Sequence, residues 1–167
     1  MIAVQISRFD PIDGPKPTVF YSDKMVDETI KERVADLLDS MAHGSEAFVH
    51  SFEGGKIYSI NKMIDIKSQQ ARGKKESLLA SVILDHQPSE KLREFVEEKL
   101  QFLEQDINAN MPDLAMIFYL HRDVGDEERA ETFGIYNALL TQIQMLHYEI
   151  HSKKIEVPPY EDYLSFD

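Results

Sequence analysis

The side chains with the clearest chemical potential form a basic cluster between residues 67 and 75, made of Lys67, Arg72, Lys74 and Lys75. An arginine guanidinium is permanently charged and can bind two phosphate oxygens at once. Gly73 beside it would let a partner approach the backbone closely. We therefore predict partner-binding roles for Lys67, Gly73, Lys74 and Lys75, in which the lysines steer an anionic partner. The alternative is a solvated polar loop.

A second spacing with chemical meaning lies near the C-terminus, where His147 and His151 are four residues apart. Metal sites on helices use this spacing. The segment does not match His-Glu-x-x-His, because Glu149 falls on a different helix face from the base of that motif. We interpret the pair as two surface histidines and predict no metal site.

The sequence lacks the common catalytic patterns. It has no cysteine, no phosphate-cradling glycine loop and no Gly-x-Ser-x-Gly motif, and its acids are dispersed. We expect neither a stand-alone catalytic centre nor a cofactor. Scattered carboxylates that converge in the fold are the open alternative.

The overall charge limits the kinds of partner. The 167 residues contain 18 Lys and Arg against 30 Asp and Glu, which gives a formal net charge of −12. Such a surface repels phosphate backbones, so we do not expect nucleic acid as a partner.

The start, MIAVQISRFD, does not resemble a signal peptide, and no apolar run approaches the roughly 20 residues that span a bilayer. We expect a cytoplasmic protein that reaches membranes only through its partners.

Hydrophobic periodicity predicts the elements that must position these residues. Alternation of apolar and polar residues predicts strands over 2–9 and 18–21. The proline- and glycine-rich stretch between them reads as a long turn. We assign Gly14 and Pro15 to the geometry of this turn.

A helix and three more strands follow. Apolar residues at steps of three and four predict the helix over 26–41, with Ser22 or Asp23 as its N-cap. The second of the three strands alternates either throughout or with a slip near Lys62. The third is a nearly continuous apolar run, which is typical of a strand covered on both faces. These strands are predicted over 47–52, 56–66 and 78–84.

The last part of the chain is mainly helical. Apolar stripes predict helices over 88–107 and 126–153, and residues 114–120 fit either a short helix or a strand. Residues 1–155 are predicted to form one domain. Residues 156–167 form an acidic tail with aromatic side chains, for which we predict an extended conformation.

The order of these elements predicts the fold class. Two hairpins, joined by a connection across the first helix, make a five-stranded antiparallel sheet. The first helix would lie on one face and the C-terminal helices on the other. We therefore predict an α+β protein with three layers, α/β/α, and the element order β-β-α-β-β-β-α-α.

This order resembles that of longin domains, which have a profilin-like fold. Two segments resemble folliculin and the nitrogen-permease-regulator-like proteins. One is RFDPIDGPK, residues 8–16, which leads into Val19-Phe20-Tyr21, and the other is Ala71-Arg72-Gly73 before the apolar run 78–84. The resemblance covers residues 1 to about 107. The sequence departs from these families because it lacks their downstream DENN-type domains, and this puts intrinsic catalytic activity in doubt.

The resemblance implies a small GTPase as partner, with Arg72 as the arginine finger that stimulates GTP hydrolysis. It also implies that residues 1–155, as a longin-like domain, pair with a second copy or with another longin or roadblock-like domain. One alternative is a structural longin subunit of a membrane-trafficking or tethering complex. Another is a profilin-like small-molecule sensor with a pocket between the sheet and a helix.

Overall fold

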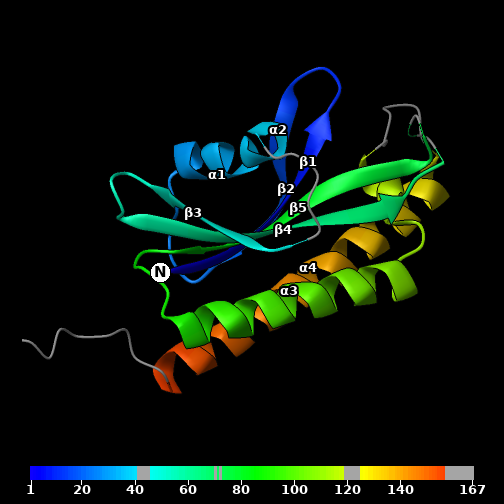
Figure 1. Cartoon of the computed structure of the whole chain (residues 1–167). Coiled ribbons are helices and arrows are strands. Elements are labelled where there is room, and N and C mark those ends of the chain that lie inside the picture. The colour runs from blue at the N-terminus through cyan, green and yellow to red at the C-terminus, as the bar shows by residue number, and fades with distance from the viewer. Residues whose placement is uncertain (41–45, 70, 72, 119–124, 157–167) are drawn as a thin grey trace, which may run out of the picture.

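An antiparallel sheet with helices on both faces organises the chain (Figure 1). The computed structural model describes residues 1–40, 46–69, 71, 73–118 and 125–156. In chain order the elements are β1 (Ile2–Asp10), β2 (Gly14–Ser22), α1 (Glu28–Ala35), α2 (Leu37–Ser40), β3 (Phe48–Phe52), β4 (Ile57–Lys67), β5 (Lys75–Leu84), α3 (Glu90–Asn110), the 3-10 helix η1 (Leu114–Phe118) and α4 (Asp126–Glu156).

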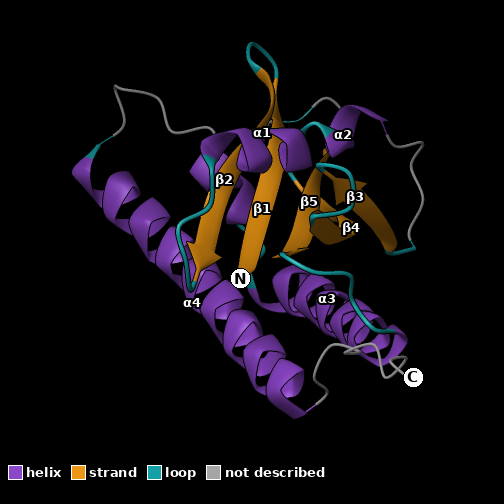
Figure 2. Cartoon of the chain, turned by 90° about the vertical axis from the view of Figure 1, so that its left-hand side faces the viewer, coloured by secondary structure: helices purple, strands orange, loops and turns teal. Residues whose placement is uncertain are grey.

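The strands lie side by side in the order β2-β1-β5-β4-β3, and every neighbouring pair is antiparallel. Helices α1 and α2 cover one face, while α3 and α4 cover the other as an antiparallel pair (Figures 1 and 2). This arrangement confirms the predicted α+β class, the three layers and the order of the elements.

The first hairpin is longer than predicted, because β2 begins at Gly14 rather than at Thr18. Pro15 and Pro17 lie within β2, opposite residues of β1. A proline cannot donate to a ladder, but β2 is an edge strand, where one side of the backbone needs no strand partner. In the sequence these prolines indicated a turn. Because β2 is at the edge of the sheet, they can belong to a strand.

The N-cap of α1 differs from the prediction. Asp27 caps the helix, and its carboxylate accepts a backbone N–H of the first turn at 2.8 Å. Ser22 and Asp23 instead join the ends of β1 and β2. The Ser22 hydroxyl donates to the carbonyl of Ile2 (3.0 Å), and Asp23 accepts the N–H of the same residue (2.9 Å). The predicted end of this helix, at residue 41, lies outside the described residues.

The pairing of β4 with β5 is continuous from Tyr58 opposite Leu84 to Lys67 opposite Lys75, so there is no slip near Lys62. Lys62 instead points to the α3 side of the sheet with only 8% of its surface exposed. Its Nζ lies 3.1 Å from Oε2 of Glu104 on α3. The aliphatic part of the Lys62 side chain is buried, while its ammonium group reaches a partner near the surface. A lysine can therefore occupy a position in β4 where the alternation calls for an apolar residue.

Strand β5 lies at the centre of the sheet, as predicted, and its residues 78–84 are all buried. Alternate side chains enter two cores. The larger core, between the sheet and α3, η1 and α4, includes Leu78, Ala80, Val82, Leu84, Leu100, Ile107, Leu114, Leu139 and Ile143. The smaller core, under α1 and α2, includes Ala3, Val26, Ile30, Val34, Leu37, Phe52, Leu79 and Ile83.

A row of polar side chains crosses the sheet on the α1 side. Gln5 on β1 and Asn61 on β4 both lie opposite Ser81 of β5, and all three are fully buried. The Gln5 Nε2 donates to the Lys31 carbonyl of α1 at 2.8 Å. Hydrogen bonding therefore helps to hold α1 on this face, whereas the opposite core is almost wholly apolar.

The ambiguous segment over 114–120 contains a short helix, η1, up to Phe118. It follows α3 and packs against α4, which returns along the sheet (Figure 1). Across the described ranges, no helix has the length and apolar character needed to cross a bilayer.

The N-cap of α3 provides a test of this local assignment. The Ser89 hydroxyl oxygen accepts the backbone N–H of Leu92 at 3.2 Å. We predict that Ser89→Ala lowers the free energy of unfolding by about 1 kcal/mol, because the first turn loses this bond. Ser89→Asp, which retains the acceptor, should stay close to the wild type in urea denaturation. Equal losses in both variants would contradict the capping role.

Candidate functional site

The basic cluster lies on the hairpin between β4 and β5. Lys67 is the last residue of β4 and Lys75 is the first of β5, and they are directly paired. The loop between them is held by the backbone bonds Ser68 N to Lys74 O (3.1 Å) and Lys74 N to Ala71 O (2.9 Å). The backbone of Gly73 and Lys74 has positive φ, +95° and +59°, which turns the chain back into β5.

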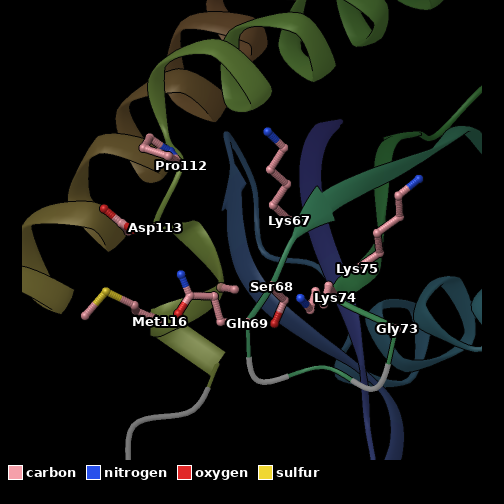
Figure 3. A pocket seen from close by; sticks show the side chains of 10 residues that line it. Lys67, Ser68, Gln69, Gly73, Lys74, Lys75, Pro112, Asp113 and Met116 are labelled. Atoms are coloured by element: carbon pink, nitrogen blue, oxygen red, sulfur yellow. The ribbon is translucent and has the colours of Figure 1, made fainter.

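This hairpin forms one wall of a surface hollow of about 620 Å³ (Figure 3). The facing wall comes from the turn that follows α3 and from η1, far along the chain. The hairpin contributes Lys67, Ser68, Gln69, Gly73, Lys74 and Lys75, and the facing wall contributes Pro112, Asp113, Ala115 and Met116.

The structure thus brings the predicted partner-binding residues Lys67, Gly73, Lys74 and Lys75 together around one hollow. Arg72, the candidate arginine finger, lies outside the described residues. Gly14 and Pro15 are not in the lining of the hollow. They lie at the start of β2, where Gly14 has a φ of +80°.

Sequence reasoning missed the wall opposite the lysines, namely Pro112, Asp113, Ala115 and Met116. The sequence indicated only that a helix breaks before residue 112 and that an ambiguous segment follows. The contact between this segment and the hairpin joins residues about forty positions apart, and no local pattern encodes such a contact.

The three lysines carry charge that the described residues do not neutralise by ion pairing. Among those residues, Lys67, Lys74 and Lys75 form no ion pair, and all three are exposed. The lining contains one carboxylate, that of Asp113. The hollow is therefore locally positive in a chain whose formal net charge is −12.

The neighbouring β1–β2 hairpin shows the contrasting case, in which cations are paired. Asp10 Oδ2 lies 2.9 Å from Lys16 Nζ and 2.7 Å from Arg8 Nη2. Lys16 and the N–H groups of Ile12 and Asp13 hold the pKa of Asp10 well below its ordinary value. These cations are held within the β1–β2 hairpin, whereas Lys67, Lys74 and Lys75 form no ion pair among the described residues.

The hollow offers cationic groups and apolar surface side by side. Ammonium groups bind carboxylates or phosphates, while Pro112, Ala115 and Met116 provide apolar surface. The lining described here contains no histidine or cysteine to act as a base or nucleophile. The arrangement suits a partner that carries both negative charge and apolar side chains.

The two C-terminal histidines do not both lie on the surface, which corrects the prediction. His147 is only 8% exposed, because it lies on the buried side of α4 and its ring packs edge-on against the ring of Tyr21. The two ring centroids are 5.0 Å apart. Its Nε2 lies 3.9 Å from Oδ1 of Asp23. The exposed His151 stacks on it at a centroid distance of 6.2 Å. Within the described ranges, no three acidic or histidine side chains are placed to hold a metal ion.

Comparison with known proteins adds no closer assignment: no model of a protein family matches the chain, and no curated protein matches it either. The structure alone therefore defines the class of this protein. It is an α+β domain whose five-stranded antiparallel sheet lies between helices.

The burial of His147 predicts a pH dependence of stability. Burial lowers the pKa of His147 below its usual 6.5, although Asp23 opposes this shift. As the pH falls toward 6.5 and below, this histidine binds protons more readily in the unfolded chain than in the folded chain. The free energy of unfolding should therefore fall as the pH decreases. We predict a shallower fall between about pH 7 and about pH 5 in His147→Gln, measured by urea denaturation. An unchanged slope in His147→Gln would contradict the assignment.

Proposed function

We propose that this chain is a longin-type protein-interaction module whose β4–β5 hairpin binds a small GTPase. The observation that carries the proposal is the set of exposed lysines, Lys67, Lys74 and Lys75, which form no ion pair within the described ranges and lie beside apolar surface in an otherwise acidic chain. A nucleotide-loaded GTPase presents both phosphate charge and protein surface. Complementary charge favours encounter with such a partner.

The architecture supports the longin assignment. The two hairpins, the helix between them and the C-terminal helices on the opposite face follow the expected longin order. This order is shared by proteins with different roles, so the hairpin, rather than the fold, argues for the partner.

Arg72 is the proposed arginine finger. It directly precedes Gly73, which lines the hollow, and the same loop carries Lys74. A guanidinium that reaches the phosphates of a bound GTPase would stabilise the charge that spreads over their oxygens in the transition state. The chain would then stimulate a reaction whose catalytic centre belongs to the partner.

A small-molecule sensor is less well supported. Such a sensor needs space between the sheet and a helix, but Leu78, Val82 and Leu100 fill the larger core and Leu79 and Ile83 fill the smaller one. The hollow at the hairpin borders the larger core only through Ala115, and it does not lie between the sheet and a helix.

A second function, that of a structural longin subunit in a trafficking or tethering complex, is favoured by the outer surface of α3 and α4. Phe102, Met145 and Tyr148 are 52%, 56% and 71% exposed there. Phe102 and Met145 line one shallow groove between the two helices. Exposed apolar groups that gather in this way mark interaction surfaces, through which a second longin or roadblock-like domain would pair.

The catalytic part of the proposal is tested by GTP hydrolysis. We expect the wild-type chain to stimulate hydrolysis by a small GTPase from the same genome. Arg72→Ala should reduce that stimulation by on the order of 10³-fold, because the charge of the finger is lost. Single-turnover hydrolysis with each candidate GTPase measures the effect. Binding without stimulation, unchanged by Arg72→Ala, would exclude an arginine finger and leave the structural-subunit function.

The binding part is tested by charge reversal. We expect Lys67→Glu/Lys74→Glu/Lys75→Glu to weaken GTPase binding by at least about tenfold, measured by calorimetry. The matched control Lys24→Glu/Lys56→Glu/Lys91→Glu changes the net charge equally at exposed lysines outside the hollow. An equal loss in both variants would show that net charge, rather than the hairpin, determines binding.

A further inference from the structure

The walls of the hollow specify the chemistry of a peptide ligand as well as that of a protein surface. One wall is lined by Lys67, Lys74 and Lys75, and the other is lined by Pro112, Ala115 and Met116. In Figure 3 the ammonium group of Lys75 points away from the second wall. A segment that fits both walls must carry carboxylates next to aromatic or aliphatic side chains. It must also lack positive charge.

The chain itself contains such a segment at residues 157–167, VPPYEDYLSFD, which lies outside the described residues. Its aromatic residues, Tyr160, Tyr163 and Phe166, recur at steps of three. Glu161 and Asp162 lie between the first two of them, and the segment contains no lysine or arginine. Its composition thus complements both walls of the hollow.

The length of α4 separates this segment from the hollow of its own chain. Helix α4 begins at the end of the molecule where η1 lies and runs to the opposite end (Figure 1). Its 31 residues span about 46 Å. The aromatic residues follow Glu156 by at most ten positions, which even a fully extended chain covers in about 36 Å. The segment therefore reaches the hollow of another molecule more readily than its own.

We infer that the hollow formed by the β4–β5 hairpin and η1 binds residues 157–167 of a second copy of this chain. The lysines pair with Glu161 and Asp162, and the aromatic side chains pack on the apolar wall. Reciprocal exchange between two copies closes a dimer, while one-way exchange builds a head-to-tail series. The inference does not depend on a GTPase, but the segment would compete with any partner that uses the same hollow.

The acidic charge of the whole chain favours binding of residues 157–167 at the hollow over binding elsewhere on the surface. Two copies with a formal net charge of −12 repel one another, so an acidic segment has little reason to approach most of the surface. Lys67, Lys74 and Lys75, which gather around one hollow, provide a local exception.

A complementation experiment with two full-length variants tests the inference. The hollow variant is Lys67→Glu/Lys74→Glu/Lys75→Glu, and the segment variant is Tyr160→Ala/Tyr163→Ala/Phe166→Ala. Sedimentation velocity over a concentration series, with no GTPase present, measures self-association. We expect the wild type to associate and each variant alone to do so at least about tenfold more weakly. Their mixture should form a one-to-one complex, because one variant supplies the segment and the other supplies the hollow.

Other outcomes would overturn the inference. A wild type that stays monomeric, or a mixture of the two variants that stays monomeric, excludes exchange between copies. Undiminished association of the hollow variant places the interface elsewhere. The control Lys24→Glu/Lys56→Glu/Lys91→Glu must associate like the wild type.

A second measurement does not depend on how well the variants fold. A fluorescent peptide of residues 157–167 should bind the full-length wild-type chain saturably, and unlabelled peptide should displace it. A peptide with alanine at the three aromatic positions should bind at least about tenfold more weakly. Equal binding of the two peptides contradicts the apolar contact that we infer. Since no GTPase is present, failure here is distinguishable from failure of the proposed function.

Discussion

The burial of β5 on both faces is the constraint on which the other layers depend. Its side chains alternate between two cores, so Leu78, Ala80 and Val82 need a cover on one face and Leu79 and Ile83 need a cover on the other. One helical layer would leave half of this strand in water, at a cost of roughly 1.5–3 kcal/mol for each large apolar side chain. The three layers follow from this requirement, and the neighbouring strands β1 and β4 become the supports on which the helices pack.

The two helical layers differ in the interactions that hold them on the sheet: both have an apolar core, and the α1 layer also has a buried hydrogen bond. On the α3–α4 side the packing is almost wholly apolar, and Lys62 joins it by extending its ammonium group to Glu104. On the α1 side the centre of the sheet is polar, and Gln5 donates to a carbonyl of α1. Apolar burial tolerates small shifts, whereas a buried hydrogen bond requires a particular position of the helix. The α1 layer is therefore positioned by direction-dependent contacts, and the larger core supplies most of the buried apolar area.

The binding chemistry proposed for the hollow rests on common residue types in an uncommon combination. Some lysines of this acidic chain have acidic neighbours, as Lys16 does with Asp10. The β4–β5 hairpin extends beyond the sheet, and η1 places Ala115 and Met116, rather than a row of acids, opposite it. The resulting hollow combines positive charge with apolar surface. The GTPase proposed as a partner and the acidic, aromatic segment 157–167 are both ligands of that chemistry, and their competition would link self-association to partner binding.

The sequence by itself determined the fold class, the central position of β5 and the confinement of the basic cluster to one short segment, because periodicity and turn residues are local signals. Only the tertiary structure decided which distant segments meet. It placed η1 opposite the hairpin, buried His147 against Tyr21, and gave the cap of α1 to Asp27 because Asp23 binds the start of β1. Periodicity shows which side of an element is apolar, but it does not show which other element covers that side. The contacts that form the hollow depend on that pairing.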